Sequence, residues 1–374
     1  MRIRLAVWAS AALASAGSLP GADFYVSTDG RDSNPGTVEQ PFRTIGHAYK
    51  HAAPGVTIHV LPGVYDDYSW DYGIHLRKSG TAERPIVLRS EVRVGAIIDG
   101  RNASDRNQGF YIDGCYNVVD GFEIQHCPHG GIAIYADGNR IIHNDIHHNG
   151  NPPSASTNGR DGIYSEKGTR GNFYEGNSIH DNGRAGSNRD HGLYLCGKDE
   201  VVLNNVLFRN AACGLQIAGY STVSNMRVCN NVMAWNGTSG IILWMRVKGV
   251  EIRNNILYRN GHWGLNSYEA HGGGVVVDHN LVFGNRDGDY NFTGGRSDFA
   301  YTVGQTLSAD PCFVKGACAD FDAHLAPGSP AIGAGANLHE VFASSRDGAE
   351  RPASGAWDLG PYVARHPEAA RTGP

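Results

Sequence analysis

One short pattern, Asn-x-apolar-x-x-Asn, recurs six times in the middle of the chain and limits the possible folds more than any other feature. Its copies begin 24 to 33 residues apart, at Asn144, Asn177, Asn205, Asn231, Asn255 and Asn280. A second pattern, a Gly followed by an apolar residue, lies between them, as in Gly162-Ile163 and Gly192-Leu193. Self-similarity at such a period is typical of a solenoid, in which each repeat packs only on its neighbours.

Each repeat has room only for two or three very short strands, and such strands do not form a stable sheet alone. They must pair with the equivalent strands of the next repeat, about 4.8 Å away along the axis. We expect the corner asparagines to adopt the left-handed backbone conformation and to hydrogen-bond along the axis through their amides. The predicted fold class is all-β: a single-stranded right-handed parallel β-helix solenoid with an N-terminal capping helix.

The composition agrees with many short strands and turns, and it narrows the function. Gly accounts for 50 of 374 residues and only 18% of the residues are charged, which excludes a coiled coil and a disordered acidic chain. The formal net charge of −5 provides no overall field that would gather nucleic acid or an anionic membrane surface. We therefore expect neither as a partner, and a polyanionic ligand would need a local basic site.

Residues 1–22 have the pattern of an export signal, because Arg2 and Arg4 precede an apolar stretch that is followed by small residues. This pattern predicts a secreted or periplasmic protein. No later stretch of the sequence is long and apolar enough to span a bilayer. The remainder of the chain is expected to contain one β-helix domain, and the protein is expected to be a monomer.

The β-helix domain is expected to cover residues 23–362, followed by a loose tail over 363–374. Its N-terminal cap, about residues 40–54, contains a helix with one apolar face, formed by Ile45, Ala48, Tyr49 and Ala52. The repeats run from about 56 to 306. From about 307 to 362 the repetition gives way to a segment rich in Pro, Gly and Asp, which is expected to cover the last coil.

Motifs at both ends of the chain carry a family resemblance. Near the start they are Asp23-Phe-Tyr-Val-Ser-Thr-Asp-Gly, Gln40-Pro-Phe-Arg-Thr-Ile and Leu61-Pro-Gly-Val-Tyr, and near the end Leu325-Ala-Pro-Gly-Ser-Pro. In these motifs the chain resembles secreted right-handed β-helix proteins of the pectate lyase-like superfamily. That superfamily includes polysaccharide lyases, uronan C5-epimerases, glycoside hydrolases and proteins with no assigned activity. The N-terminal block is most similar to that of family 9 pectate lyases and of alginate-active β-helix enzymes.

The resemblance implies an acidic polysaccharide as the substrate, but the site motifs differ from those of the family. Family 9 lyases typically carry an Asp-Asp-Gly calcium motif, and the nearest match, Arg160-Asp161-Gly162, lacks one of the two Asp residues. Arg189-Asp190-His191-Gly192 is loosely similar to the Asp-Pro-His-Asp motif of alginate epimerases. The resemblance thus leaves Ca²⁺ open as a cofactor and requires none.

The filled core of a β-helix means that a polymer must bind on its outer face. Strand alternation places Tyr164, Tyr194 and Gln216 on one outward row and Trp244 and Tyr268 on the next. The adjoining loops add Asp161, Lys167, Asp190, His191, Lys198 and Arg246. Aromatic faces stack on sugar rings, and Lys and Arg bind carboxylates. We therefore expect the substrate to be bound by Lys167, Lys198, Gln216, Trp244, Arg246 and Tyr268.

β-Elimination from a uronate needs a neutralised carboxylate, a base that takes the C5 proton and an acid that protonates the leaving oxygen. In this band we expect His191 to be the base and Tyr164 or Tyr194 the acid. Arg246 or Lys198 would neutralise the carboxylate. The sequence favours a polysaccharide lyase, or a C5-epimerase that starts with the same proton abstraction.

Asp161 and Asp190 leave other functions open. Both stand just before strands in neighbouring repeats, where they either form turns or lie close enough to share an ion or a substrate hydroxyl. A glycoside hydrolase needs two carboxyl groups about 5–9 Å apart, and either Asp161 or Glu166 could form such a pair with Asp190. The third alternative is a secreted protein that binds glycans through the same aromatic face without catalysis.

Overall fold

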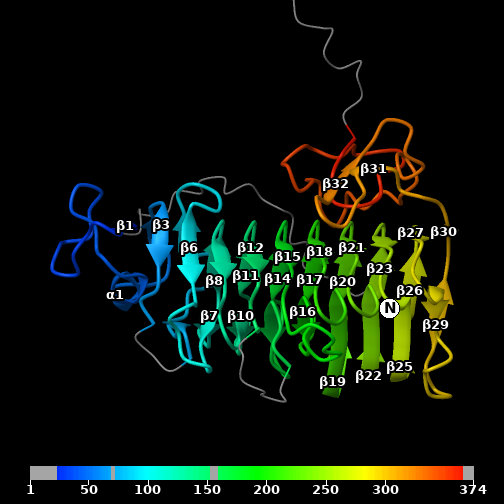
Figure 1. Cartoon of the computed structure of the whole chain (residues 1–374), viewed down its shortest axis with the longest axis horizontal. Coiled ribbons are helices and arrows are strands. Elements are labelled where there is room, and N and C mark those ends of the chain that lie inside the picture. Colours follow the sequence, from blue (N-terminus) through cyan, green and yellow to red (C-terminus); the bar gives the residue numbers. More distant parts are fainter. Residues whose placement is uncertain (1–22, 69–71, 152–158, 365–374) are drawn as a thin grey trace, which may run out of the picture.

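Short strands that alternate inward apolar and outward polar side chains stack in register to form a long parallel solenoid, whose axis runs across Figure 1. The computed structural model describes residues 23–68, 72–151 and 159–364, which form a solenoid of about 9 turns with almost no helix. The predicted fold class is confirmed. The expected export signal, residues 1–22, and residues 365–374 of the expected tail lie outside the described residues.

Three parallel sheets form the walls of the solenoid within the described residues. Sheet I contains β1 (Asp23–Val26), β2 (Thr57–Val60), β5 (Ile86–Ser90), β8 (Asn117–Asp120), β11 (Arg140–Ile142), β14 (Phe173–Glu175), β17 (Val201–Leu203), β20 (Arg227–Cys229), β23 (Glu251–Arg253), β26 (Val275–Asp278) and β29 (Tyr301–Val303). Sheet II contains β4 (Ile74–Leu76), β7 (Gln108–Ile112), β10 (Gly130–Ile134), β13 (Ile163–Ser165), β16 (Leu193–Leu195), β19 (Leu215–Ser224), β22 (Ile241–Lys248), β25 (Trp263–Gly273) and β28 (Gly288–Asn291). Sheet III contains β3 (Gly63–Tyr65), β6 (Ala96–Asp99), β9 (Glu123–Gln125), β12 (Asp145–His147), β15 (Ser178–His180), β18 (Val206–Phe208), β21 (Val232–Ala234), β24 (Ile256–Tyr258), β27 (Asn280–Phe283) and β30 (Thr306–Leu307).

The core is a stack of inward side chains from successive coils. In sheet II, β13 pairs with β16 and β16 with β19, so that Ile163, Leu193 and Leu215 form one fully buried row. The residues next to them, including Tyr164 and Tyr194, point outward. The register of sheet II therefore agrees with the alternation predicted from the repeat.

The repeated asparagines form two hydrogen-bonded ladders inside the solenoid. In the first ladder, the backbone N–H and the Nδ2 of Asn205 both donate to Oδ1 of Asn231, at 2.8 and 3.0 Å. Asn231 donates in the same way to Asn255, and Asn255 to Asn280. A parallel ladder contains Asn149, Asn182, Asn210, Asn236, Asn260 and Asn285. The predicted bonding along the axis is present, and it satisfies backbone groups at two corners of each coil.

The left-handed backbone conformation falls one residue earlier than predicted. The residues directly before ladder asparagines have positive φ angles, for example 54° at Asn204 and at Asn230, 58° at Asn254 and 57° at Trp235. The ladder asparagines themselves do not, because each must hold its amide parallel to the axis to bond to the next coil. The residue that forms the turn therefore differs in type from coil to coil. The Asn that follows it holds the turn in place through its hydrogen bonds to the next coil.

The one helix among the described residues, α1 (Ile45–Lys50), lies beside the first coils (Figure 1). Thr44 caps its start, because Oγ1 of Thr44 accepts the backbone N–H of His47 at 3.1 Å. The four residues predicted on its apolar face are all buried: Ile45, Ala48, Tyr49 and Ala52. Among the described residues, no helix is long and apolar enough to cross a membrane.

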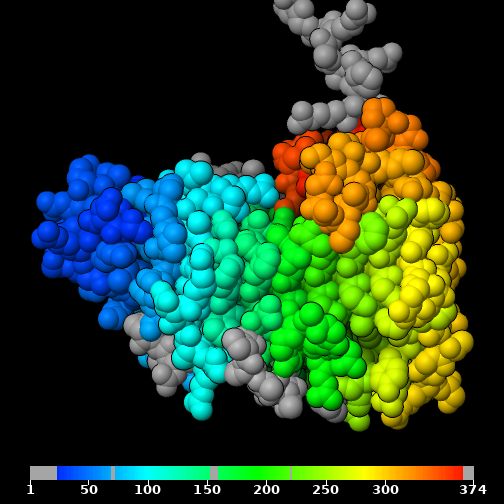
Figure 2. Space-filling view, in the orientation of Figure 1, coloured from blue at the N-terminus to red at the C-terminus, as the bar shows by residue number. Residues whose placement is uncertain are grey.

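The segment after β30 was expected to cover the last coil, but it folds back along the side of the solenoid (Figures 1 and 2). Its hairpin, β31 (Phe313–Lys315) with β32 (Asp322–Leu325), packs on the outer faces of β18, β21, β24 and β27. The segment packs there because the outward side chains of these strands are apolar: Val206, Val232, Ile256 and Leu281. Strands that are apolar on both faces need cover on both faces. The uninterrupted apolar runs in this part of the sequence are the signal that predicts this packing.

One carboxyl group lies inside the solenoid wall. The side chain of Glu200 is fully buried, and its Oε1 accepts Ser165 Oγ at 2.6 Å and Asn172 Nδ2 at 3.1 Å. Burial raises the pKa of Glu200 to about 7, despite these hydrogen bonds. Because the folded state holds this proton more tightly than the unfolded chain does, stability should fall as the pH rises from about 4.5 to about 7.

This pKa shift predicts a pH-dependent effect of Glu200→Gln. Between pH 5 and pH 8, the ionisation of Glu200 should lower the free energy of unfolding by about 2–3 kcal/mol. The variant lacks this ionisation, so its loss of stability over that range should be smaller by about the same amount. Urea denaturation at the two pH values measures the difference, with Glu251→Gln, a partly exposed glutamate, as the control. Parallel pH dependence of the Glu200 variant and the parent would contradict the prediction.

Candidate active site

A row of five tyrosines runs along the outer face of sheet II, parallel to the solenoid axis. It consists of Tyr72, Tyr111, Tyr135, Tyr164 and Tyr194, and neighbouring ring centroids are 5.7, 4.7, 6.2 and 5.6 Å apart in that order. The register explains the row, because Tyr111, Ala133, Tyr164 and Tyr194 are aligned on successive strands. Tyr135, two residues after Ala133, fills the gap that the alanine leaves. We call this set the tyrosine row.

The outward positions of sheet II continue the row toward the C-terminal coils. Gln216 follows Tyr194 in register, and Trp244 on β22 pairs with Tyr268 on β25. Tyr268 is 57% exposed, Trp244 is half-buried, and Gln216 is nearly buried at 8%. Arg246 is exposed near Trp244 on the same strand. These four predicted substrate-binding residues therefore share one face, and Gln216 has the least access to a ligand.

The two predicted lysines lie where strands of the tyrosine row end. Lys167 follows β13 and is exposed, whereas Lys198 follows β16, one coil further on, and is half-buried. Glu166 precedes Lys167 on the outward side, two residues after Tyr164. Aromatic rings, a carboxyl group and cations thus meet around β13 and β16.

Tyr164 and Glu166 interact directly. Burial raises the pKa of Tyr164 well above its usual value, and the neighbouring Cys196 and Glu166 raise it further. Part of the Glu166 effect is a hydrogen bond between the two side chains. The Tyr164 phenol therefore keeps its proton at any working pH, which is the state of a proton donor.

His191 lies below this surface. Its side chain is only 3% exposed, and its Nδ1 lies 2.9 Å from Sγ of Cys213. Burial lowers the pKa of His191 to about 4, so the ring is neutral at neutral pH. The ring meets Tyr194 edge-on, with centroids 5.5 Å apart. In this position the His191 ring packs against Tyr194 and is largely shielded from the outer face of sheet II.

Asp161 and Asp190 are buried and bound to their own loops. Oδ1 of Asp161 accepts the backbone N–H of His191 at 2.8 Å, and burial raises the pKa of Asp161 well above its usual range. Burial also acts on Asp190, but hydrogen bonds from Arg184 outweigh it and lower the pKa. Nε of Arg184 lies 2.8 Å from Oδ2 of Asp190, which is fully buried. The two aspartates do not occupy equivalent positions in their coils. Asp161 is aligned with His191 of the next coil, and Asp190 comes one residue before His191.

This environment does not fit a calcium ion at the two aspartates. Calcium needs several ionised or carbonyl oxygens directed at one point. Here burial raises the pKa of Asp161, which disfavours its ionised form, and Asp190 is already paired with an arginine. Across residues 23–68, 72–151 and 159–364, no group of three or more His, Cys, Asp and Glu side chains is placed to hold a metal ion.

A model of the Pel9A-like right-handed β-helix region matches residues 24–293, most of the solenoid. The chain belongs to the Pel9A-like right-handed β-helix family. Among characterised relatives, pectate lyase PEL9 of Emericella nidulans is 43% identical over 94 residues, which are 25% of this chain and 22% of that protein. Pectate lyase L of Paenibacillus polymyxa is 26% identical over an alignment that covers 84% of this chain and 73% of that protein.

Solved structures agree on the fold of this Pel9A-like chain. The crystal structure of pectate lyase Pel9A superposes with a TM-score of 0.67, at 18% identity, over 92% of this chain and 96% of that one. A rhamnogalacturonan lyase superposes with a TM-score of 0.51, at 16% identity, over 79% of this chain and 91% of that one. At such identities the likeness establishes the parallel β-helix and nothing finer.

Three members of the tyrosine row, Tyr72, Tyr111 and Tyr135, were not predicted from the sequence. All three precede Asn144, where the first copy of the asparagine repeat begins, so the repeat does not mark their positions. A usable signal was present, because Tyr111 lies between Phe110 and Ile112 as Tyr194 lies between Leu193 and Leu195. Extending the alternation toward the N-terminus of this Pel9A-like chain finds it.

Proposed function

We propose that this Pel9A-like protein is a polysaccharide lyase, or a C5-epimerase of related chemistry, that acts on a uronate-containing polysaccharide. Membership of the family and the two pectate lyase relatives support a polysaccharide lyase or epimerase-like function. The observation that carries the proposal is the outer face of sheet II. It joins a continuous row of aromatic rings to exposed cations, a combination that suits a polymer of acidic sugars.

The face contains groups for each part of a β-elimination. Lys167 and Lys198 would neutralise the uronate carboxylate, which makes the C5 proton acidic enough to remove. In our assignment the Glu166 carboxylate takes that proton, the bond between C4 and the glycosidic oxygen breaks, and a C4=C5 double bond forms. The Tyr164 phenol donates its proton to the leaving oxygen. Tyr194, one coil away, would hold the sugar, and His191 beneath it would support the Tyr194 ring.

This assignment differs from the roles expected from the sequence in the base and in one neutralising residue, since Lys167 joins Lys198 in place of Arg246. Tyr164 stays the acid, but the base becomes Glu166, because His191 is buried beneath Tyr194. Asp161 and Asp190 act through the loops that they hold and do not contact the sugar. A hydrolase mechanism would pair Asp190 with either Asp161 or Glu166. Asp190 is fully buried and bound to Arg184, so it is not available to a substrate in either pair.

The test is the ultraviolet absorbance of unsaturated uronate ends, measured on pectate, alginate and glycosaminoglycans with and without EDTA. We expect absorbance to rise on one of these polymers, at the same rate with EDTA, because the described aspartates are already bound to protein groups. A change of uronate composition by NMR without scission would identify the epimerase form. Reducing ends without absorbance would indicate a hydrolase, and retention on a glycan column without any product would indicate a binding protein.

A further inference from the structure

A pocket of about 310 Å³ lies on a different wall of the solenoid from the tyrosine row. One side is formed by sheet I, with Arg89 at the end of β5, Asp120 at the end of β8 and His143 just after β11. The other side is formed by residues 346–348 of the C-terminal segment. The pocket therefore exists only because that segment folds back along the coils. Its volume is at the small end of the range of about 300–1,000 Å³ for small-molecule sites.

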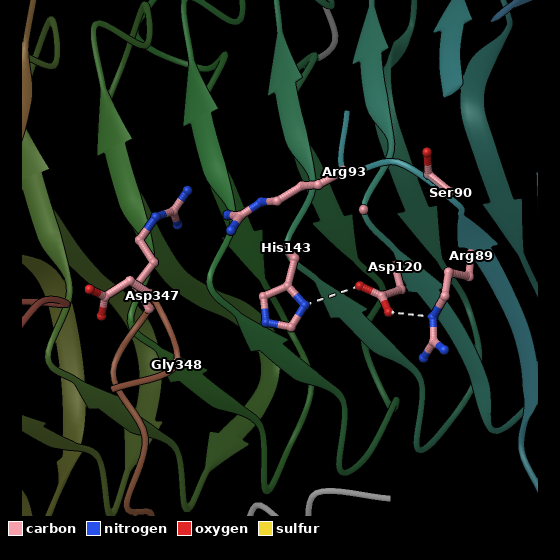
Figure 3. A pocket seen from close by; sticks show the side chains of 9 residues that line it. Arg89, Ser90, Arg93, Asp120, His143, Asp347 and Gly348 are labelled. Atoms are coloured by element: carbon pink, nitrogen blue, oxygen red, sulfur yellow. Dashed lines mark hydrogen bonds and ion pairs between the residues drawn. The ribbon is translucent and has the colours of Figure 1, made fainter. Parts of the chain in front are cut away.

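The carboxylates of the pocket already have partners. Asp120 lies between two cationic or hydrogen-bonding groups, with Oδ2 3.0 Å from Arg89 Nε and Oδ1 3.0 Å from His143 Nδ1 (Figure 3). Oδ1 of Asp347 accepts a hydrogen bond from Ser345. Neither carboxylate is ion-paired to Arg93 or to Arg346. Among the described residues that line the pocket, Arg93 and Arg346 are therefore left without a carboxylate partner, and from outside the lining the charge of Asp145 acts on Arg346.

Arg93 and Arg346 converge on the same space from the two sides. Arg93 is exposed and reaches over His143 toward the C-terminal segment (Figure 3). Arg346 is only 8% exposed, and its Nη2 donates to Ser178 Oγ at 2.8 Å. Burial lowers the pKa of Arg346, and the nearby charge of Arg93 adds to the effect. Within the described residues Arg93 forms no ion pair, so two like charges face each other across the pocket.

We propose that this pocket binds the carboxylate of a single uronic acid residue, as a second saccharide site separate from sheet II. A carboxylate has two acceptor oxygens in one plane, which match the donors of a guanidinium group and would relieve the repulsion between Arg93 and Arg346. Three guanidinium groups against two carboxylates leave the pocket about one positive charge, which suits a monoanion. Phosphate carries close to two charges and would face both aspartates. The Asp347 carboxylate accepts hydroxyl donors, which a sugar has and a simple anion lacks.

The experiment is calorimetric titration of the full chain at one low salt concentration, with galacturonic acid, its methyl ester, galactose and inorganic phosphate as probes. The test variant is Arg93→Gln, because the exposed side chain of Arg93 contributes nothing to the buried core. Arg286→Gln is the matched control: it removes the same charge from an exposed arginine that already pairs with Asp287 at 3.0 Å. Trp244→Ala separates this pocket from the face of sheet II.

We expect galacturonic acid to bind, and the ester and galactose not to bind. Arg93→Gln should weaken galacturonic acid binding by about tenfold or more. Arg286→Gln and Trp244→Ala should leave that affinity unchanged. Equal affinity in Arg93→Gln and the parent, no binding by the parent, or tighter binding of phosphate than of galacturonic acid would each overturn the proposal. The titration involves no turnover, so its outcome is independent of the proposed lyase activity, which Arg93→Gln should leave unchanged.

Discussion

Replacing Tyr164 with Phe is expected to lower kcat/KM on the uronate polymer by roughly 10²–10⁴-fold, the usual contribution of a positioned proton donor. The change removes one hydroxyl from the tyrosine row and leaves the ring, so the melting temperature should stay close to that of the parent. The physical reason is that the Tyr164 phenol, held protonated by burial and by Glu166, is the group placed to protonate the leaving oxygen. Glu166→Gln should cause a loss of similar size, since it removes the proposed base.

The control for this pair is Tyr72→Phe, at the N-terminal end of the same row, where the side chain is 39% exposed and far from Glu166 in the stack. It should bind and turn over the polymer nearly as well as the parent. If Tyr164→Phe keeps full activity while Tyr194→Phe loses it, the reaction centre lies one coil further along. If all three variants keep full activity, the tyrosine row has no part in proton transfer.

Replacing Asn231 with Ala is expected to lower the free energy of unfolding by about 3–5 kcal/mol, because several buried groups lose their partners at once. Its Nδ2 donates to Val202 O at 2.9 Å and to Cys229 O at 3.0 Å, and its Oδ1 accepts the backbone N–H of Asn205. All of these atoms lie inside the solenoid, where water cannot replace the lost bonds. The substitution should destabilise both adjoining coils, because each ladder Asn is hydrogen-bonded to the Asn of the next coil.

Urea denaturation followed by circular dichroism measures this loss. Asn231→Leu fills a similar volume with no polar atoms and should be nearly as destabilised, which separates lost hydrogen bonds from a cavity. Asn102→Ala, at an exposed turn residue, should change the unfolding free energy by less than about 0.5 kcal/mol. A loss below about 1 kcal/mol in both Asn231 variants would show that the ladder contributes little to stability.

Much of the fold and part of the site are predictable from the sequence, for one physical reason. In a stacked solenoid the spacing of the repeat sets the register, and the register decides which side chains share a face. This is why Tyr164 and Tyr194, and likewise Trp244 and Tyr268, are found paired on adjacent strands as expected. The inward rows and the bonding of the asparagine ladders follow from the same periodicity.

The repeat pattern does not show how deeply a side chain next to a strand is buried. Asp161, Asp190 and His191 stand next to strand glycines, and their spacing alone is the same for a surface catalytic group and for a buried group that holds a loop. Only the packing of loops over these positions buries them, and with burial come the altered pKa values of Asp161 and His191. Their roles therefore depend on neighbours in space that the local sequence does not specify.

The repeat in the sequence is sufficient to predict the parallel β-helix, the side chains that share each face and the aromatic character of one face, because these depend on short-range periodicity. The tertiary structure alone decided where the C-terminal segment packs, and with it the pocket between Arg93 and Arg346. Those two arginines come together only because the apolar outer faces of β18, β21, β24 and β27 attract a segment that follows them in the chain. Contacts across such separations depend on how whole surfaces match, which no local pattern of residues records.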